Sequence, residues 1–76
     1  MVKLNLEVHE YMLTYQAARG KPPTLAQIAE GVQTISHRSS ARYSVRVLMD
    51  YGLVVEEHGK WANHARRYRA ISNHSE

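Results

Sequence analysis

Two consecutive prolines, Pro22 and Pro23, interrupt any helix at this point of the chain, because proline lacks the backbone N–H and clashes inside a helix. Thr24 follows directly, and Gln27 stands three residues later. This spacing is that of a capping box, in which the threonine hydroxyl accepts from an early N–H and the glutamine side chain reaches back. We therefore expect a helix over residues 24–31.

This helix has only about two turns, so packing against the rest of the domain must hold it in place. Gly31 allows a left-handed backbone that would end the helix, with Val32 folding back on it. We expect a tight turn over 33–35, with Ile35 buried. The apolar face of the helix comprises Leu25, Ile28, Ala29 and Val32.

A longer helix is expected over residues 4–19, where apolar side chains recur at helical spacing. Gly20 and the prolines end it. Its role is to form the backing layer of the core. The apolar stripe comprises Leu4, Val8, Tyr11, Met12, Tyr15 and Ala18.

A third helix is expected over residues 36–51. Ser36 is the favoured N-cap, with Ser39 as the alternative for a later start, and Gly52 ends the helix. The inward stripe comprises Ser40 or Ala41, Val45, Leu48 and Met49.

The chain continues with a predicted hairpin over residues 53–71. Residues 53–58 have an apolar start and a polar end, Gly59 marks a turn, and residues 67–71 alternate basic and apolar side chains. Glu56 and Glu57 are adjacent on a strand and point to opposite faces. They are either solvated or hold basic side chains of the second strand.

The predicted fold is one domain over residues 1–76, mainly α with a small β-hairpin. Its element order is that of a helix-turn-helix followed by a wing. The wing has two strands, or three if a short strand forms near Thr34. With 76 residues and no cysteine, this domain must be held by a small packed core.

Charge is distributed unevenly along the chain, whose net charge is +3. Residues 1–37 carry three basic and three acidic side chains, whereas residues 38–76 carry seven basic against four acidic ones. Six of those seven are arginines, whose planar fork pairs with phosphate or with a guanine edge. Double-stranded DNA is therefore the predicted partner.

Residues 20–29, Gly-Lys-Pro-Pro-Thr-Leu-Ala-Gln-Ile-Ala, resemble the start of the second helix in the DNA-binding domain of LexA-type repressors. The segment with Val45, Leu48 and Gly52-Leu53-Val54 is similar to the end of the recognition helix there and in MarR-like winged helices. The resemblance covers roughly residues 5–71. It implies that residues 36–46 present the reading face and that residues 60–67 form the wing.

Arginines recur at four-residue spacing on the third predicted helix, which places Arg38, Arg42 and Arg46 along one face. Asp50 stands four residues after Arg46 and can pair with it, whereas no acid stands four residues after the other two. The alternative is a solvated face. Tyr43 either contacts DNA or covers the edge of the core. The predicted DNA-binding residues of this helix are Ser36, Arg38, Ser39, Ser40, Arg42, Tyr43 and Arg46.

The predicted wing is also basic, and such loops track phosphates or enter the minor groove. Trp61 has two interpretations, packing against the core or a dimer partner, and contact with nucleic acid. The predicted DNA-binding residues of the wing are Lys60, Asn63, His64, Arg66 and Arg67.

No motif indicates catalysis, so we expect no enzyme, no catalytic residue and no cofactor. The five histidines form no i, i+4 pair on a helix, and we expect no metal site. No apolar run has the length of a membrane span and no signal peptide opens the chain, so the expected location is the cytoplasm.

The expected function is sequence-specific binding of double-stranded DNA as a small transcriptional repressor, acting as a homodimer. The dimer surface is the outer face of the first helix or the wing with Trp61. One alternative is a DNA-binding module for replication, excision or plasmid partition. The other is a winged helix that binds proteins. Protonation of His37, His58 and His64 would tighten DNA binding near pH 6.

Overall fold

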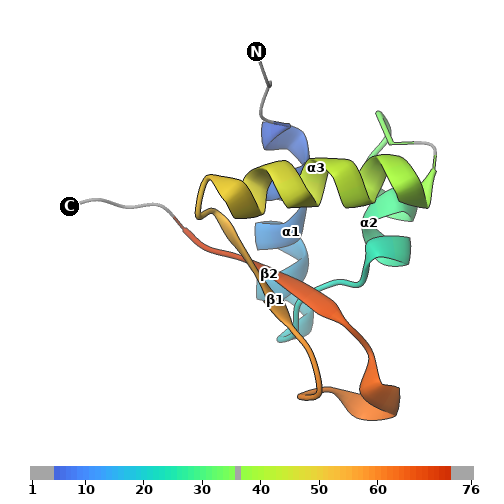
Figure 1. Ribbon diagram of the computed structural model, residues 1–76, viewed down its shortest axis with the longest axis vertical. Helices are drawn as coiled ribbons and strands as arrows, with labels where there is room; N and C mark the ends of the chain where they lie inside the picture. Colours follow the sequence, from blue (N-terminus) through green and yellow to red (C-terminus); the bar gives the residue numbers. More distant parts are fainter. Residues whose placement is uncertain (1–4, 36, 73–76) are drawn as a thin grey trace.

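Three helices precede a β-hairpin in the computed structural model, which describes residues 5–35 and 37–72 (Figure 1). The predicted class, mainly α with a small hairpin, is confirmed, and the layout is consistent with a winged helix. The elements are α1 (Leu6–Arg19), α2 (Leu25–Gly31), α3 (Arg38–Asp50), β1 (Val54–Glu57), the 3-10 turn η1 (Ala62–His64) and β2 (Arg67–Ala70).

Helix α1 begins two residues later than predicted, because Asn5 is its N-cap. The Asn5 Oδ1 accepts a 3.2 Å hydrogen bond from the backbone N–H of Val8. Gly20 ends the helix with a φ of 73°, as expected. Leu4 lies outside the described residues, and Ala18 is exposed rather than part of the buried stripe. The buried residues of α1 are Val8, Met12 and Tyr15.

The capping box of α2 is confirmed. Thr24 Oγ1 accepts from the Gln27 N–H at 3.2 Å, and Gln27 Oε1 accepts from the Thr24 N–H at 2.9 Å. The helix ends at Gly31 as expected, but the expected left-handed backbone there was wrong: Gly31 has no positive φ, and Val32 is the C-cap in an extended conformation. The glycine is needed for a different reason, because a Cβ at this position would overlap the ring of Tyr11.

Helix α3 begins at Arg38, with His37 at the N-cap and no side-chain hydrogen bond there. Ser36, the expected cap and first residue, lies outside the described residues. The helix ends at Asp50, and Gly52 follows with a φ of 77°. Its buried side includes two positions that the pattern did not predict, Ser44 and Val47, besides Ala41, Val45 and Leu48.

Strands β1 and β2 pair antiparallel, from Val54 opposite Ala70 to Glu57 opposite Arg67. Both are shorter than the predicted segments. In the described part of the chain the sheet has two strands, and Thr34 lies in a turn rather than in a third strand. The outer edge of β2 also bonds to the segment before α2: the Tyr68 N–H donates to the Pro23 carbonyl at 3.0 Å.

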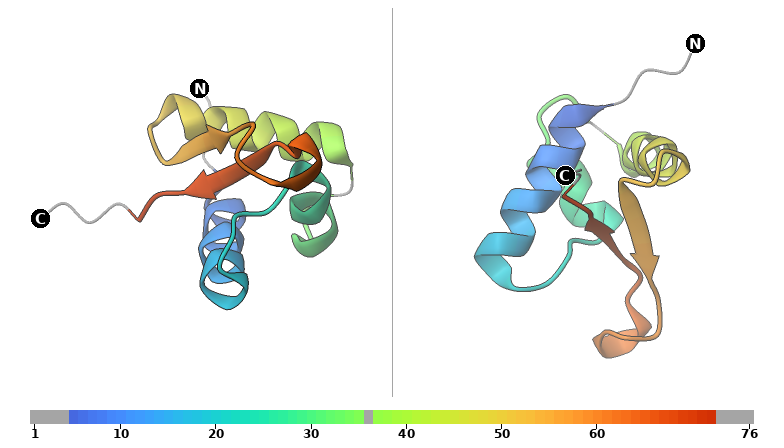
Figure 2. Two further views of the ribbon diagram at one scale, coloured as in Figure 1. Left: turned by 90° about the horizontal axis from the view of Figure 1, so that it is seen from below. Right: turned by 90° about the vertical axis from the view of Figure 1, so that its left-hand side faces the viewer.

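The core lies where α3 crosses α1 and the base of the hairpin (Figures 1 and 2). Gln16 of α1 fixes β2 there, because its amide bonds both the N–H and the carbonyl of Ala70. Figure 2 shows the tip of the hairpin projecting away from the three helices. The buried cluster comprises Val8, Met12, Ile28, Val32, Ile35, Ala41, Val45, Leu48, Val54, Tyr68 and Ala70.

Candidate nucleic-acid interface

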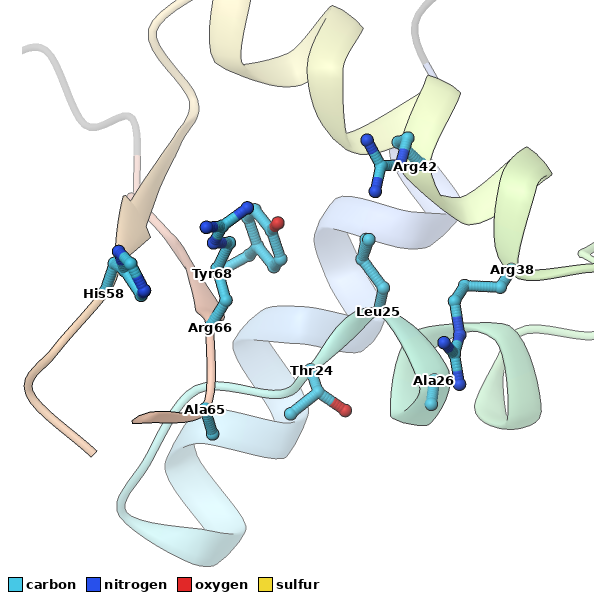
Figure 3. A pocket seen from close by; sticks show the side chains of 9 residues that line it. All are labelled: Thr24, Leu25, Ala26, Arg38, Arg42, His58, Ala65, Arg66 and Tyr68. Atoms are coloured by element: carbon cyan, nitrogen blue, oxygen red, sulfur yellow. The ribbon is translucent and has the colours of Figure 1, made fainter. Parts of the chain in front are cut away.

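An open groove of about 450 Å³ runs between α3, the start of α2 and the hairpin (Figure 3). Its side chains come from elements far apart in the sequence, because the hairpin folds back beside α3. The lining residues are Thr24, Leu25, Ala26, Arg38, Arg42, His58, Ala65, Arg66 and Tyr68.

The lining of this groove is electropositive. Arg38 and Arg42 enter it from α3, and Arg66 and His58 enter it from the hairpin (Figure 3). None of the lining residues is acidic. A groove with one sign of charge attracts a ligand of the opposite sign, here an anion.

A second hollow of about 170 Å³ continues the groove toward the end of α3. The two hollows share Leu25, Arg42, Arg66 and Tyr68. The second adds Arg46 together with two acids, Asp50 and Glu56. The charge of the groove is therefore most positive beside the N-terminal half of α3. Within the described residues no ion pair joins Arg46 to Asp50, although the sequence allows one.

The outer side of α3 carries polar side chains that are free to contact a partner. The structure decides against Tyr43 as a cover for the core edge, because 61% of this residue is exposed. Ser44, next to it, is buried instead. The exposed residues of α3 are Asp50 and six that the sequence predicted to bind DNA: Arg38, Ser39, Ser40, Arg42, Tyr43 and Arg46.

The tip of the hairpin presents Lys60 and Asn63, both exposed. Asn63 adopts a left-handed conformation, with a φ of 63°, inside the turn η1. The side chain of His64 lies outside what the structure describes. Arg66, with half of its side chain exposed, pairs with Glu56 at 2.7 Å across the hairpin.

Arg67 differs from its neighbour Arg66, because it is turned toward the body of the domain. Its Nη1 donates to the Pro22 carbonyl at 2.8 Å and to Gln27 Oε1 at 3.2 Å. Its Nε is buried and has no partner among the described residues. The sequence placed Arg67 on the DNA-binding surface, whereas in the structure it holds β2 beside the capping box of α2.

Trp61 packs within its own hairpin. Its Nε1 donates to Glu57 Oε1 at 2.9 Å, and the ring centroid lies 5.9 Å from Lys60 Nζ and 5.8 Å from Arg67 Cζ. It does not belong to the main buried cluster. Trp61 therefore does not pack against the core as one interpretation expected, and contact with a second chain or with nucleic acid stays a prediction.

Glu57 organises the stem of the hairpin. Its carboxylate accepts from Arg69 Nε at 2.7 Å and from Trp61, and Lys60 Nζ lies 3.8 Å away. The hydrogen bond from Arg69 is the main cause that lowers the pKa of Glu57 below its usual range. With the Glu56–Arg66 pair, this confirms that both acids hold basic side chains.

Six lining residues of the groove were not among the predicted DNA-binding residues, and three of these six have polar side chains: Thr24, His58 and Tyr68. Tyr68 could have been found from the alternation of the strand, which turns it away from Arg67. Burial raises its pKa, so the hydroxyl stays neutral and can donate or accept. Thr24 could not have been found, because its hydroxyl is assigned to the helix cap and only the fold brings it beside the hairpin.

Comparison with protein-family models, curated proteins and solved structures gives no match for this chain. Among the residues that the structure describes, no helix has both the length and the apolar character needed to cross a membrane.

Proposed function

We propose that this chain is a winged helix-turn-helix protein that binds double-stranded DNA in a sequence-specific manner. Helix α3 enters the major groove, whose width admits one helix, and the hairpin lies over the neighbouring backbone. The sugar-phosphate strand between them runs along the groove of the protein. The observation that carries the proposal is this groove, which three arginines and a histidine line without any acid.

The biological role that we propose is that of a small transcriptional repressor in the cytoplasm. Occupation of an operator blocks polymerase sterically, and this mechanism needs no cofactor and no catalytic group. A single module of this size covers a short site, so a homodimer on a palindrome supplies the remaining specificity.

The test is a titration of the protein on random genomic duplex fragments, at about 50 mM and about 200 mM salt, with recovery of the tightest fragments. We expect one palindromic sequence to be enriched and binding to weaken steeply with salt. The double variant Arg38→Ala/Arg42→Ala should lose binding, since it removes the α3 side of the groove.

The matched control compares single variants that each remove one positive charge. Arg42→Ala removes one of the three arginines that line the groove. Lys21→Ala changes an exposed residue of the α1–α2 loop that does not line the groove. Binding that is equally weak in both variants would mean that net charge alone matters. No binding by the wild type at low salt would contradict the proposed function and direct the search to an acidic protein partner.

A further inference from the structure

The arginines of this protein fall into two groups according to what they contact. In the hairpin, Arg66, Arg67 and Arg69 are all bonded within the chain, to Glu56, Pro22 and Glu57 respectively. On α3, the side chains of Arg38, Arg42 and Arg46 form no hydrogen bond or ion pair with another described residue. Arg67 and Arg69 therefore stabilise the fold, whereas Arg66 is paired with Glu56 but stays half exposed in the groove. The arginines of α3 keep their donors for a partner.

The exposed side of α3 offers a narrow choice of base contacts. Only its arginines can donate two hydrogen bonds to one base edge, because the helix contains no Asn, Gln, Lys or Glu. Its one acid, Asp50, is the last residue of the helix and can only accept. Arginine bonds the O6 and N7 acceptors of guanine, whereas adenine is read by Asn or Gln. Serine and tyrosine add single, less selective contacts. The chemistry of this face thus favours guanine.

The two arginines nearest the start of α3 are the best placed for this reading. Arg38 and Arg42 stand where no lining residue of the groove is acidic. Arg42 also lines the second hollow, together with Asp50 and Glu56, whereas Arg46 lines only that second hollow. A recognition helix also contacts base edges mainly through its N-terminal residues.

The spacing of the two arginines sets the spacing of the bases. Four residues of a helix advance about 6 Å along its axis, and stacked base pairs are about 3.4 Å apart. With the axis of α3 along the major groove, as proposed above, Arg38 and Arg42 reach positions about two base pairs apart.

We propose that Arg38 and Arg42 each recognise the major-groove edge of a guanine, and that the DNA site of this protein contains two guanines about two base pairs apart in each half. This proposal rests on the proposed function, because it names the bases that the DNA-binding face selects. Arg46 contacts the sugar-phosphate backbone instead.

The experiment uses the full chain and a library of random duplexes, from which bound sequences are recovered and aligned. The most enriched duplex is then made again with 7-deazaguanine at each enriched guanine, which removes the N7 acceptor and leaves Watson–Crick pairing intact. We expect binding to weaken by about tenfold at two of these positions in each half of the site, as for the loss of a bidentate contact.

A pair of variants separates base reading from charge. Arg42→Lys keeps the positive charge but loses the fork, so we expect it to lose the preference for one guanine. Arg46→Lys is the same change four residues along the helix and should keep the full preference. Both residues are exposed, so neither change disturbs the core.

Two results would overturn the proposal in distinguishable ways. If duplexes are enriched without guanines, or if 7-deazaguanine leaves affinity unchanged, guanine reading is refuted while DNA binding stands. An unaltered preference in Arg42→Ala would refute guanine reading by that residue, because alanine has no donor for a base edge. If no duplex binds at all, the proposed function itself is refuted, and with it the reading of guanine.

Discussion

The guanidinium of Arg67 donates a 2.8 Å hydrogen bond to the carbonyl oxygen of Pro22. The next residue of β2 repeats the attachment, because the Tyr68 N–H donates to the Pro23 carbonyl. Two successive bonds thus fix the hairpin against the segment that leads into α2. Since Thr24 and Arg66 line the groove from these two segments, the same bonds set the width of the groove.

Removing this attachment should cost stability. We expect Arg67→Ala to lower the free energy of unfolding by about 1–2 kcal/mol, because it leaves the Pro22 carbonyl and Gln27 without a charged donor. Urea denaturation followed by the fluorescence of Trp61 measures this change. Arg66→Ala is the control, since its exposed ion pair should contribute less than about 1 kcal/mol. Equal losses in the two variants would contradict the structural role of Arg67.

Replacing Gly31 by alanine should lower the stability of this protein, although the same change raises the stability of an ordinary helix. In an exposed helix, Gly→Ala stabilises by roughly 1 kcal/mol. Here the Cβ overlaps the ring of Tyr11, whose hydroxyl donates to the Gln27 carbonyl at 3.3 Å, so displacement of the ring also breaks a hydrogen bond. We expect Gly31→Ala to destabilise the protein by about 1–2 kcal/mol.

The same substitution should stabilise the protein once the ring is gone. In a Tyr11→Ala background, Gly31→Ala meets no aromatic ring and should raise the free energy of unfolding. Thermal unfolding of the wild type, both single variants and the double variant supplies the complete cycle. A destabilising effect of Gly31→Ala in both backgrounds would show that backbone conformation, rather than Tyr11, requires the glycine.

These two residues also mark how far sequence reasoning reaches. The capping box of Thr24 and Gln27 was predictable, because both partners lie within one helical turn and the chemistry is local. The role of Gly31 was not, because Tyr11 meets it only after α1 and α2 pack together. A glycine near a helix end suggests a left-handed cap when only the local sequence is considered. In the structure, the contact of Gly31 with the Tyr11 ring explains the glycine instead.

The residues of the candidate site also differ in whether the local sequence or only the folded chain defines their role. The exposed arginines of α3 could be predicted, because helical spacing separates them from the buried stripe. Arg66 and Arg67 could not be told apart by composition, since both are basic and adjacent. Their difference depends on the register of β2 and on the position of Pro22, which only the folded chain defines.

Acid should weaken the stem of the hairpin. The pKa of Glu57 is lowered in the folded state, mainly by the hydrogen bond from Arg69. Its carboxylate therefore stabilises the fold above the pKa of the unfolded chain, and this contribution disappears as the pH falls through the folded pKa. We expect Glu57→Gln to be less stable than the wild type at pH 7 and to lose less stability on acidification.

Chemical denaturation at several pH values between about 7 and 3 measures this effect, since that range spans the titration of a glutamate whose ordinary pKa is near 4.3. Glu10→Gln removes an exposed acid of α1 that forms no ion pair within the described residues, and it serves as the charge-matched control. The prediction fails if the two variants follow the same pH dependence.

The two sides of the groove should respond differently to mutation. Arg66 belongs to the hairpin, which under the proposed function lies over the sugar-phosphate backbone, whereas Arg42 belongs to the reading helix. We expect Arg66→Gln to weaken binding to all duplexes by a similar factor. It should also lower the slope of log affinity against log salt by about one, because one fewer counterion is released.

Arg42→Ala should instead change which duplexes bind best. Titrations of both variants on the preferred duplex and on a scrambled duplex, each at several salt concentrations, separate the two effects. A specificity ratio that falls in Arg66→Gln and stays constant in Arg42→Ala would reverse the assignment of the two faces. The hairpin would then read the bases, and α3 would lie along the backbone.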